Sequence, residues 1–113
     1  MAYDEVLADR IRELTAGVPV VEQKMFGGLA FLLGGHLAVA ASSQGGLLVR
    51  VEPAETDALL AEPGTGPMQR GGRGPMAGWL RVDSEVVVEE EALATWVQRG
   101  LDHAASLPPT PRL

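Results

Sequence analysis

Three pairs of glycines divide the first half of the chain into short apolar segments: Gly27-Gly28, Gly34-Gly35 and Gly45-Gly46. Glycine tolerates the positive φ angles of the tight turns that join antiparallel strands. We therefore expect an antiparallel meander, because parallel strands need crossover connections of roughly a dozen residues or more. The segments predicted as strands are 20–26, 29–33, 37–41 and 47–51.

Helical spacing marks both ends of the chain. Residues 3–15 place apolar side chains four, four and three positions apart, which is typical of an amphipathic helix. A second helix is predicted from about Glu90 to Ser106, with acidic residues near its positive end. The two apolar stripes are Tyr3, Leu7, Ile11 and Leu14 in the first helix, and Leu93, Trp96, Val97, Leu101 and Ala104 in the second.

The part between these helices is less regular. A proline suits the first turn of a short helix over 52–61, where no backbone N–H is needed. Residues 63–78 are rich in glycine and proline and are expected to form a loop, with a short strand near Met68 as an option. Residues 79–82 alternate as a strand, and 85–88 are expected to extend or follow it.

The predicted order is a helix, three or four strands, a helix, one or two strands and a helix. It indicates a two-layer α+β fold in one domain over residues 1–107, followed by an extended, mobile tail at 108–113. Alternation puts apolar side chains on both faces of the strands at 29–33 and 37–41, with Leu37 expected beside Val39. Because a sheet with one wet face should alternate with polar residues, we expect the last helix or a second subunit to cover the second face. A homodimer is therefore left open.

Composition removes several classes of function. The 113-residue chain has no cysteine, which excludes disulfides, zinc–thiolate sites, iron–sulfur clusters and thiol nucleophiles. Its first residues are acidic and no apolar run approaches the roughly 18 residues of a membrane span, so we expect a cytoplasmic protein without membrane association. The net charge of −6 disfavours non-specific binding to nucleic acid by the surface as a whole.

One stretch is basic, although the chain as a whole is acidic. Residues 64–82 contain no aspartate or glutamate but hold Arg70, Arg73 and Arg81, with many glycines. Such a stretch could bind a phosphate or carboxylate through backbone amides and arginine side chains. The competing interpretation is a solvated loop whose arginines balance nearby carboxylates.

Other chemistry finds no support in the sequence. His36 and His103 belong to distant segments, show no metal-binding spacing and are expected at the surface. Trp79 and Trp96 lie on apolar patterns and are expected in the core. We predict no catalytic residue, no metal site and no cofactor, and hence a protein that is not an enzyme.

Three motifs together resemble the N-terminal domain of the TfoX/Sxy family, over nearly the whole chain. They are Lys24-Met25-Phe26-Gly27-Gly28, Gly46-Leu47-Leu48-Val49-Arg50-Val51 and Pro75-Met76-x-Gly78-Trp79-Leu80. The resemblance implies an α-β(3)-α-β(2)-α fold like that of secretion chaperones, and it implies no catalytic residues. The matching positions that it marks as fold determinants are Met25, Phe26, Gly27, Gly28, Gly78 and Trp79.

Members of this family are known as regulators of natural competence that act with a cyclic-AMP-responsive activator. Those members carry a second, C-terminal helical domain, and this chain stops before one, which argues against the competence role and for a standalone domain. Our leading hypothesis is a non-enzymatic module that binds a protein partner, with the transcription machinery as a candidate. The alternative is direct binding of nucleic acid or another anion through residues 64–82, and a small ligand binder is the third class considered.

Overall fold

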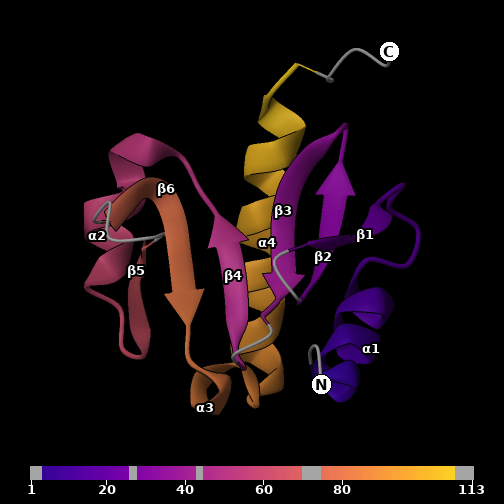
Figure 1. Cartoon of the computed structure of the whole chain (residues 1–113), viewed down its shortest axis with the longest axis horizontal. Helices are drawn as coiled ribbons and strands as arrows, with labels where there is room; N and C mark the ends of the chain where they lie inside the picture. The colour runs from indigo at the N-terminus through magenta and orange to yellow at the C-terminus, as the bar shows by residue number, and fades with distance from the viewer. Residues whose placement is uncertain (1–3, 26–27, 43–44, 70–74, 109–113) are drawn as a thin grey trace.

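The computed structural model of the protein describes residues 4–25, 28–42, 45–69 and 75–108. It confirms the α+β class: a six-stranded sheet has the order β1-β2-β3-β4-β6-β5, and all neighbouring strands are antiparallel (Figure 1). Four strands precede the middle helix. The residue patterns predicted three or four strands there, and the family resemblance implied three. The elements are α1 (Glu5–Leu14), β1 (Val21–Met25), β2 (Gly28–Leu33), β3 (His36–Ala41), β4 (Leu47–Arg50), the 3-10 turn η1 (Pro53–Glu55), α2 (Thr56–Leu60), β5 (Thr65–Gln69), β6 (Pro75–Val82), α3 (Ser84–Val87) and α4 (Glu90–Ser106).

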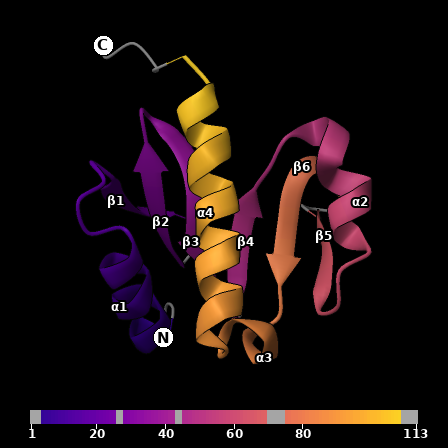
Figure 2. The same cartoon turned by 180° about the vertical axis from the view of Figure 1, so that it is seen from behind.

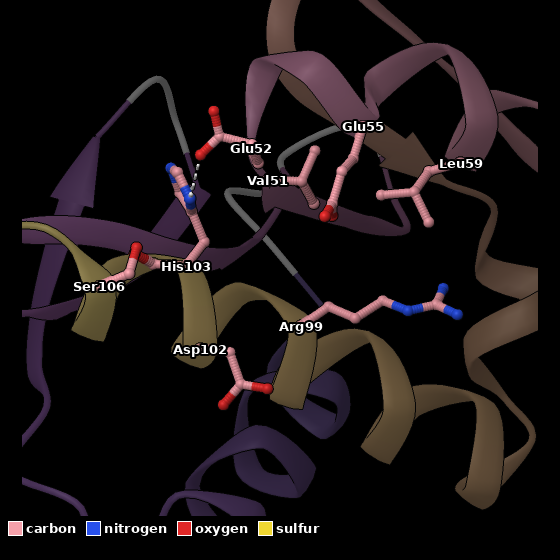
Figure 3. Close-up of a pocket in the computed structure, with 8 residues that line it drawn as sticks. All are labelled: Val51, Glu52, Glu55, Leu59, Arg99, Asp102, His103 and Ser106. Atoms are coloured by element: carbon pink, nitrogen blue, oxygen red, sulfur yellow. Dashed lines mark hydrogen bonds and ion pairs between the residues drawn. The ribbon is translucent and has the colours of Figure 1, made fainter.

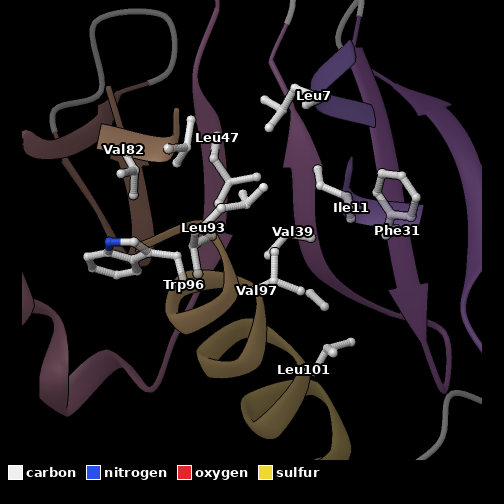
Figure 4. Close-up of a cluster of buried hydrophobic side chains, with 14 of the residues drawn as sticks. Leu7, Ile11, Phe31, Val39, Leu47, Val82, Leu93, Trp96, Val97 and Leu101 are labelled. Atoms are coloured by element: carbon white, nitrogen blue, oxygen red, sulfur yellow. The ribbon is translucent and has the colours of Figure 1, made fainter. Parts of the chain in front are cut away.

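The helices all contribute to one face of the sheet, which we call the inner face. Figure 2 shows α4 lying across the middle of this face, with α1 on one side and α2 on the other. The main core forms here from the predicted stripe of α4, the buried side of α1 and the inward residues of the strands (Figure 4). Among the described residues, no helix combines the length and apolar character that a bilayer crossing requires.

Helix α4 approaches the sheet closely because of a glycine. Gly100 is buried, and a methyl group added to it would lie 2.4 Å from the carbonyl oxygen of Ala38 in β3. Real Cβ atoms essentially never come that near a backbone oxygen, so only glycine fits without a shift. This contact fixes the distance between the helix layer and the centre of the sheet.

Helix α1 begins at a capping residue and buries two members of its predicted stripe. The carboxylate of Asp4 accepts hydrogen bonds from the backbone N–H groups of Val6 and Leu7, at 3.0 and 3.1 Å. Leu7 and Ile11 are buried as predicted, but Leu14 in the last turn is 36% exposed. The predicted fourth member, residue 3, lies outside the described residues.

A β-bulge changes the predicted faces of β3. The register with β2 shifts between Phe31 and Leu32, so that Ala38 is an extra residue in β3. Leu37 consequently joins Ala40 on the face away from the helices, whereas Ala38 and Val39 both belong to the inner core. The prediction that Leu37 lies beside Val39 was therefore wrong, because strict alternation does not anticipate a bulge.

The second half of the chain contains more regular structure than predicted. Much of the expected loop at 63–78 is β5 and the start of β6, which form a hairpin at the end of the sheet. The option of a short strand near Met68 is confirmed by β5, but the prediction of a loop for the rest was wrong. An edge strand such as β5 tolerates Pro67 without losing a required ladder bond, so the proline did not exclude a strand. Residues 85–88 were predicted to extend or follow the strand, but 84–87 form the short helix α3, with Val87 buried against the core.

Gly78 joins β6 to the crossover that leads from β4 to α2. Its φ is +86°, a conformation that side-chain-bearing residues rarely adopt. Its N–H donates to the hydroxyl of Thr56 at 2.8 Å, and its carbonyl accepts from the N–H of Val51 at 2.8 Å. Of the other motif positions, Gly28 begins β2 and Met25 ends β1, whereas Phe26 and Gly27 lie outside the described residues.

Candidate functional site

The face of the sheet away from the helices, which we call the outer face, carries a second apolar cluster. Ala30, Leu37, Ala40 and Leu48 form it, with Leu32 and Trp79 packed against them. No helical residue belongs to this cluster, so the expectation that the last helix covers the second face was wrong. Its four central members are at most 8% exposed within the single chain, so their burial does not require a second subunit.

Two arginines extend from the same face beside this cluster. The guanidinium carbon of Arg50 in β4 lies 5.4 Å from the centre of the Trp79 ring in β6, a cation–π distance. Arg81 is exposed and pairs across the strands with Leu48, while Arg50 pairs with Trp79. The two arginines are therefore diagonal neighbours on adjacent strands, a relation that typically separates Cβ atoms by about 7 Å.

No carboxylate shares the outer face with these arginines in the described part of the sheet. The strand register directs Gln23 outward next to Ala30, and Gly66 outward next to Arg81. Glu22, the acidic residue of β1, turns to the other side, where it binds Arg12 of α1. The outer face is thus positively charged, although the chain as a whole is acidic.

The other described arginines are all engaged. Arg12 forms ion pairs with Asp9 at 2.6 Å and Glu22 at 2.7 Å, and its hydrogen bond lowers the pKa of Glu22 below the usual range. Arg99 binds Glu62 at 3.0 Å. The Arg10 guanidinium donates to the backbone carbonyls of residues 87 and 88 at 2.8 and 3.3 Å. Within the described residues, Arg50 and Arg81 alone among the arginines make no hydrogen bond or ion pair.

The predicted basic stretch is only partly placed. Arg81 lies on the outer face, whereas Arg70 and Arg73 lie outside the described residues. Arg50 was not predicted, although its alternation with Leu48 along β4 was a usable signal. What the sequence could not reveal is that β4 pairs with β6, which brings Arg50 to Trp79 and Arg81. Trp79, expected in the core, is half-buried on this face, whereas Trp96 is buried in the main core as expected.

Of the two histidines expected at the surface, His36 is partly exposed and the side chain of His103 is buried. A ring nitrogen of His36 is 2.6 Å from the carbonyl oxygen of Pro108, at the start of the predicted tail, whose remaining residues lie outside the described part. The side chain of His103 is only 8% exposed, between α4 and η1. Among the described residues, no three histidine, aspartate or glutamate side chains gather into a metal-binding group.

Sequence comparison gives a match for most of the chain. Residues 12–104 match the family model described as the TfoX N-terminal domain. This range covers everything from the second half of α1 to the last turn of α4, and it includes the outer face. No curated protein matches the sequence.

Proposed function

Because the chain belongs to the TfoX N-terminal domain family, we propose that it is a non-enzymatic interaction module that docks an acidic segment of a protein partner on the outer face of its sheet. The family is a non-catalytic, regulatory one, in agreement with the resemblance of the motifs. Its regulatory character makes a component of the transcription machinery the partner that we would test first.

The observation that carries this proposal is the separation of charge between the two sides of the sheet. In the described part of the sheet, no carboxylate lies on the same face as Arg50 and Arg81, while the other described arginines form ion pairs or hydrogen bonds. Unpaired cations next to apolar side chains complement a segment that carries both carboxylates and apolar groups. The aromatic ring of Trp79 adds the kind of contact that is enriched in protein interfaces.

The positive charge of the outer face also favours binding of a different protein there over binding of a second copy of this chain. A symmetric dimer would bring the same patch of each subunit together. Arg50 and Arg81 would then approach their own equivalents, with no described carboxylate between them. The homodimer expected from the apolar second face is therefore the less favoured occupant, and light scattering of the purified protein would test it.

The experiment compares two charge reversals of equal size. Arg81→Glu changes an exposed cation on the outer face, and Lys24→Glu changes an exposed cation of β1 whose register places it on the opposite side. The probe is a fluorescent peptide of alternating glutamate and leucine, followed by anisotropy. We expect Arg81→Glu to weaken binding at least tenfold and Lys24→Glu to change it less than twofold, because the direct contacts belong to the outer face.

Three results would contradict the proposal: no binding of the peptide, equal losses in the two variants, or tighter binding of a 20-base-pair DNA duplex than of the peptide. The last would favour the alternative of nucleic-acid binding, which we rank second because duplex binders commonly neutralise about 6–10 phosphates. The described outer face offers two cations. A steep fall in DNA affinity with added salt would accompany that outcome.

A further inference from the structure

Exposed apolar side chains gather where α1 meets the junction of α3 and α4. Large apolar side chains are exposed at four described positions, and three of them, Val6, Leu14 and Val88, lie around Arg10. Val6 and Leu14 precede and follow Arg10 by one turn of α1, and the carbonyl of Val88 accepts a hydrogen bond from its guanidinium. Single exposed valines are ordinary, but a group of them marks an interaction site. We call these three residues the apolar patch.

A small pocket opens beside the apolar patch, between α1 and the first turn of α4. Its volume is about 160 Å³, and it is lined by Arg10, Glu13, Leu14, Glu90 and Leu93. Leu93 is 1% exposed, so the pocket reaches down to the main core. A cavity of roughly 150 Å³ can hold a group as large as benzene, and this pocket is therefore of the size to admit one apolar side chain.

Arg10 holds the two sides of this pocket together. Its guanidinium donates to the carbonyl oxygens of Val87 and Val88, at 2.8 and 3.3 Å. These bonds connect α1 to the end of α3, immediately before α4 begins. Because the pocket is formed within the single chain, a partner would not have to order its walls on binding, which lowers the cost of association.

Carboxylates border the pocket and give it a negative balance of charge. Glu13 and Glu90 line it, and neither takes part in an ion pair in the part of the chain that the structure describes. These two carboxylates outnumber the one guanidinium of Arg10, and the exposed Glu89 follows Val88 directly. An apolar patch with a negative border complements a segment that is apolar and basic.

A larger cleft on the other side of α4 lacks this combination. It measures about 400 Å³ and lies between α4 and the segment formed by η1 and α2 (Figure 3). His103 pairs there with Glu52 at 3.9 Å, and Arg99 is held by Glu62 at 3.0 Å. None of its lining side chains is among the large apolar ones that are exposed. The features that favour a docked partner therefore coincide at the α1–α4 pocket.

We propose that the apolar patch and this pocket bind a basic amphipathic helix of a protein partner. One apolar side chain of that helix would fill the pocket, and its lysines and arginines would face Glu13 and Glu90. A second copy of this chain is a poorer occupant, because a symmetric contact would bring these carboxylates towards their own equivalents. The inference does not depend on the proposed function, because the patch and pocket share no residue with the outer cluster.

The test is a titration of the ¹⁵N-labelled full chain with a helical peptide of lysine and leucine, whose leucines recur at spacings of three and four. Two control peptides keep this pattern: one replaces lysine by glutamate, and the other replaces leucine by serine. We expect the lysine–leucine peptide to shift the signals of Leu14, Val88 and Leu93 saturably, with a Kd below about 1 mM, and the controls to leave these signals unchanged. The glutamate–leucine peptide reports on the outer face instead, so the two proposals can fail separately.

A matched pair of valines tests the apolar patch. Val88 in the patch is 66% exposed, and Val21 in β1 is 61% exposed away from it. Val88→Ser should weaken binding of the lysine–leucine peptide at least fivefold and Val21→Ser less than about twofold, because apolar contacts at the centre of an interface carry most of its affinity.

A second matched pair tests the charge. Glu13→Gln with Glu90→Gln removes both carboxylates of the pocket, and Glu55→Gln with Asp57→Asn removes two exposed carboxylates outside it. The first double variant should weaken binding at least tenfold and the second less than about twofold.

Four results would each overturn the proposal: no saturable shift in the wild type, equal binding of a control peptide at the patch, equal losses within either matched pair, or a dimer in light scattering that Val88→Ser dissociates. The last result would assign the patch to a second copy of the chain. Unchanged signals of the core residues verify that each variant is folded.

Discussion

The two faces of one sheet differ in packing and in charge. The inner face is covered by helices and contains the largest fully buried side chains, including Phe31, Leu47 and Leu80. The outer face has a smaller apolar cluster centred on alanines and carries the two unpaired arginines. Since neighbouring residues of a strand point to opposite faces, one set of side chains in each strand packs under the helices, and the other set forms the outer face that we propose for partner binding.

The largest expected effect comes from two adjacent leucines of β4. Leu47 is 1% exposed in the inner core, and Leu48 is 8% exposed in the outer cluster. We expect Leu47→Ala to lower the free energy of unfolding by about 3 kcal/mol or more, and Leu48→Ala by about half of that, because a cavity under the helices collapses less easily than one on an open face. Urea unfolding of both variants measures the difference, and equal losses would show that the two faces contribute alike.

Replacing one glycine on each side of the sheet by alanine compares the inner and outer faces by adding a single methyl group. Gly100→Ala places a Cβ 2.4 Å from the Ala38 oxygen, whereas a Cβ on Gly66, which faces outward, meets nothing within 4 Å. Overpacking typically costs about 1–3 kcal/mol, and we expect Gly100→Ala to reach that range although alanine favours helices. Gly66→Ala should change stability by less than about 0.5 kcal/mol. Thermal unfolding provides the comparison, and a Gly100→Ala variant as stable as the wild type would refute the close approach of α4.

The smallest effect concerns the ion pair between Arg12 and Glu22. The hydrogen bond from Arg12 lowers the pKa of Glu22 in the folded state, so the carboxylate stabilises the fold above its unfolded pKa. This contribution is lost as the pH falls through the lowered folded pKa. Glu22→Gln should therefore slightly reduce stability at pH 7 and weaken the loss of stability on going from pH 5 to pH 3.

Urea midpoints between pH 7 and pH 3 measure this change, with Glu13→Gln as the control on a nearby exposed glutamate. The effect is small because both partners of the pair are more than one-third exposed, where solvent and salt screen the attraction. If the urea midpoints of the wild type and Glu22→Gln change equally with pH, the ion pair does not contribute to the stability of the fold.

Patterns within a single element predicted the fold well. The stripe of α4 places Leu93, Trp96 and Val97 in the core as expected, because helical periodicity is a local property. The turn between β2 and β3 was also predictable, since Gly34 and Gly35 adopt φ angles of +64° and +85°. Strands that depend on a distant partner were less predictable: a short strand near Met68 was an option, but its hairpin with a strand that begins at residue 75 was not expected.

The outer-face site could not be predicted from local sequence patterns alone, because it depends on contacts between distant segments. Arg50 and Trp79 meet because β4 pairs with β6 across the intervening η1, α2 and β5. His103 did have a local signal: with Leu93, Trp96 and Gly100 it continues a spacing of three, four and three along one side of α4. Its polar side chain argued for the surface, and only the packing of η1 over this position explains its burial.

The order of the strands leaves β1 and β5 at the two borders of the sheet, each with unpaired backbone groups on one side. Such borders can recruit further chains edge to edge and grow into aggregates. β1 carries the charged residues Glu22 and Lys24, and β5 contains Pro67, and both features discourage an incoming strand. The fold thus leaves the outer cluster without a covering helix, while these residues protect the edges of the sheet from pairing with further chains.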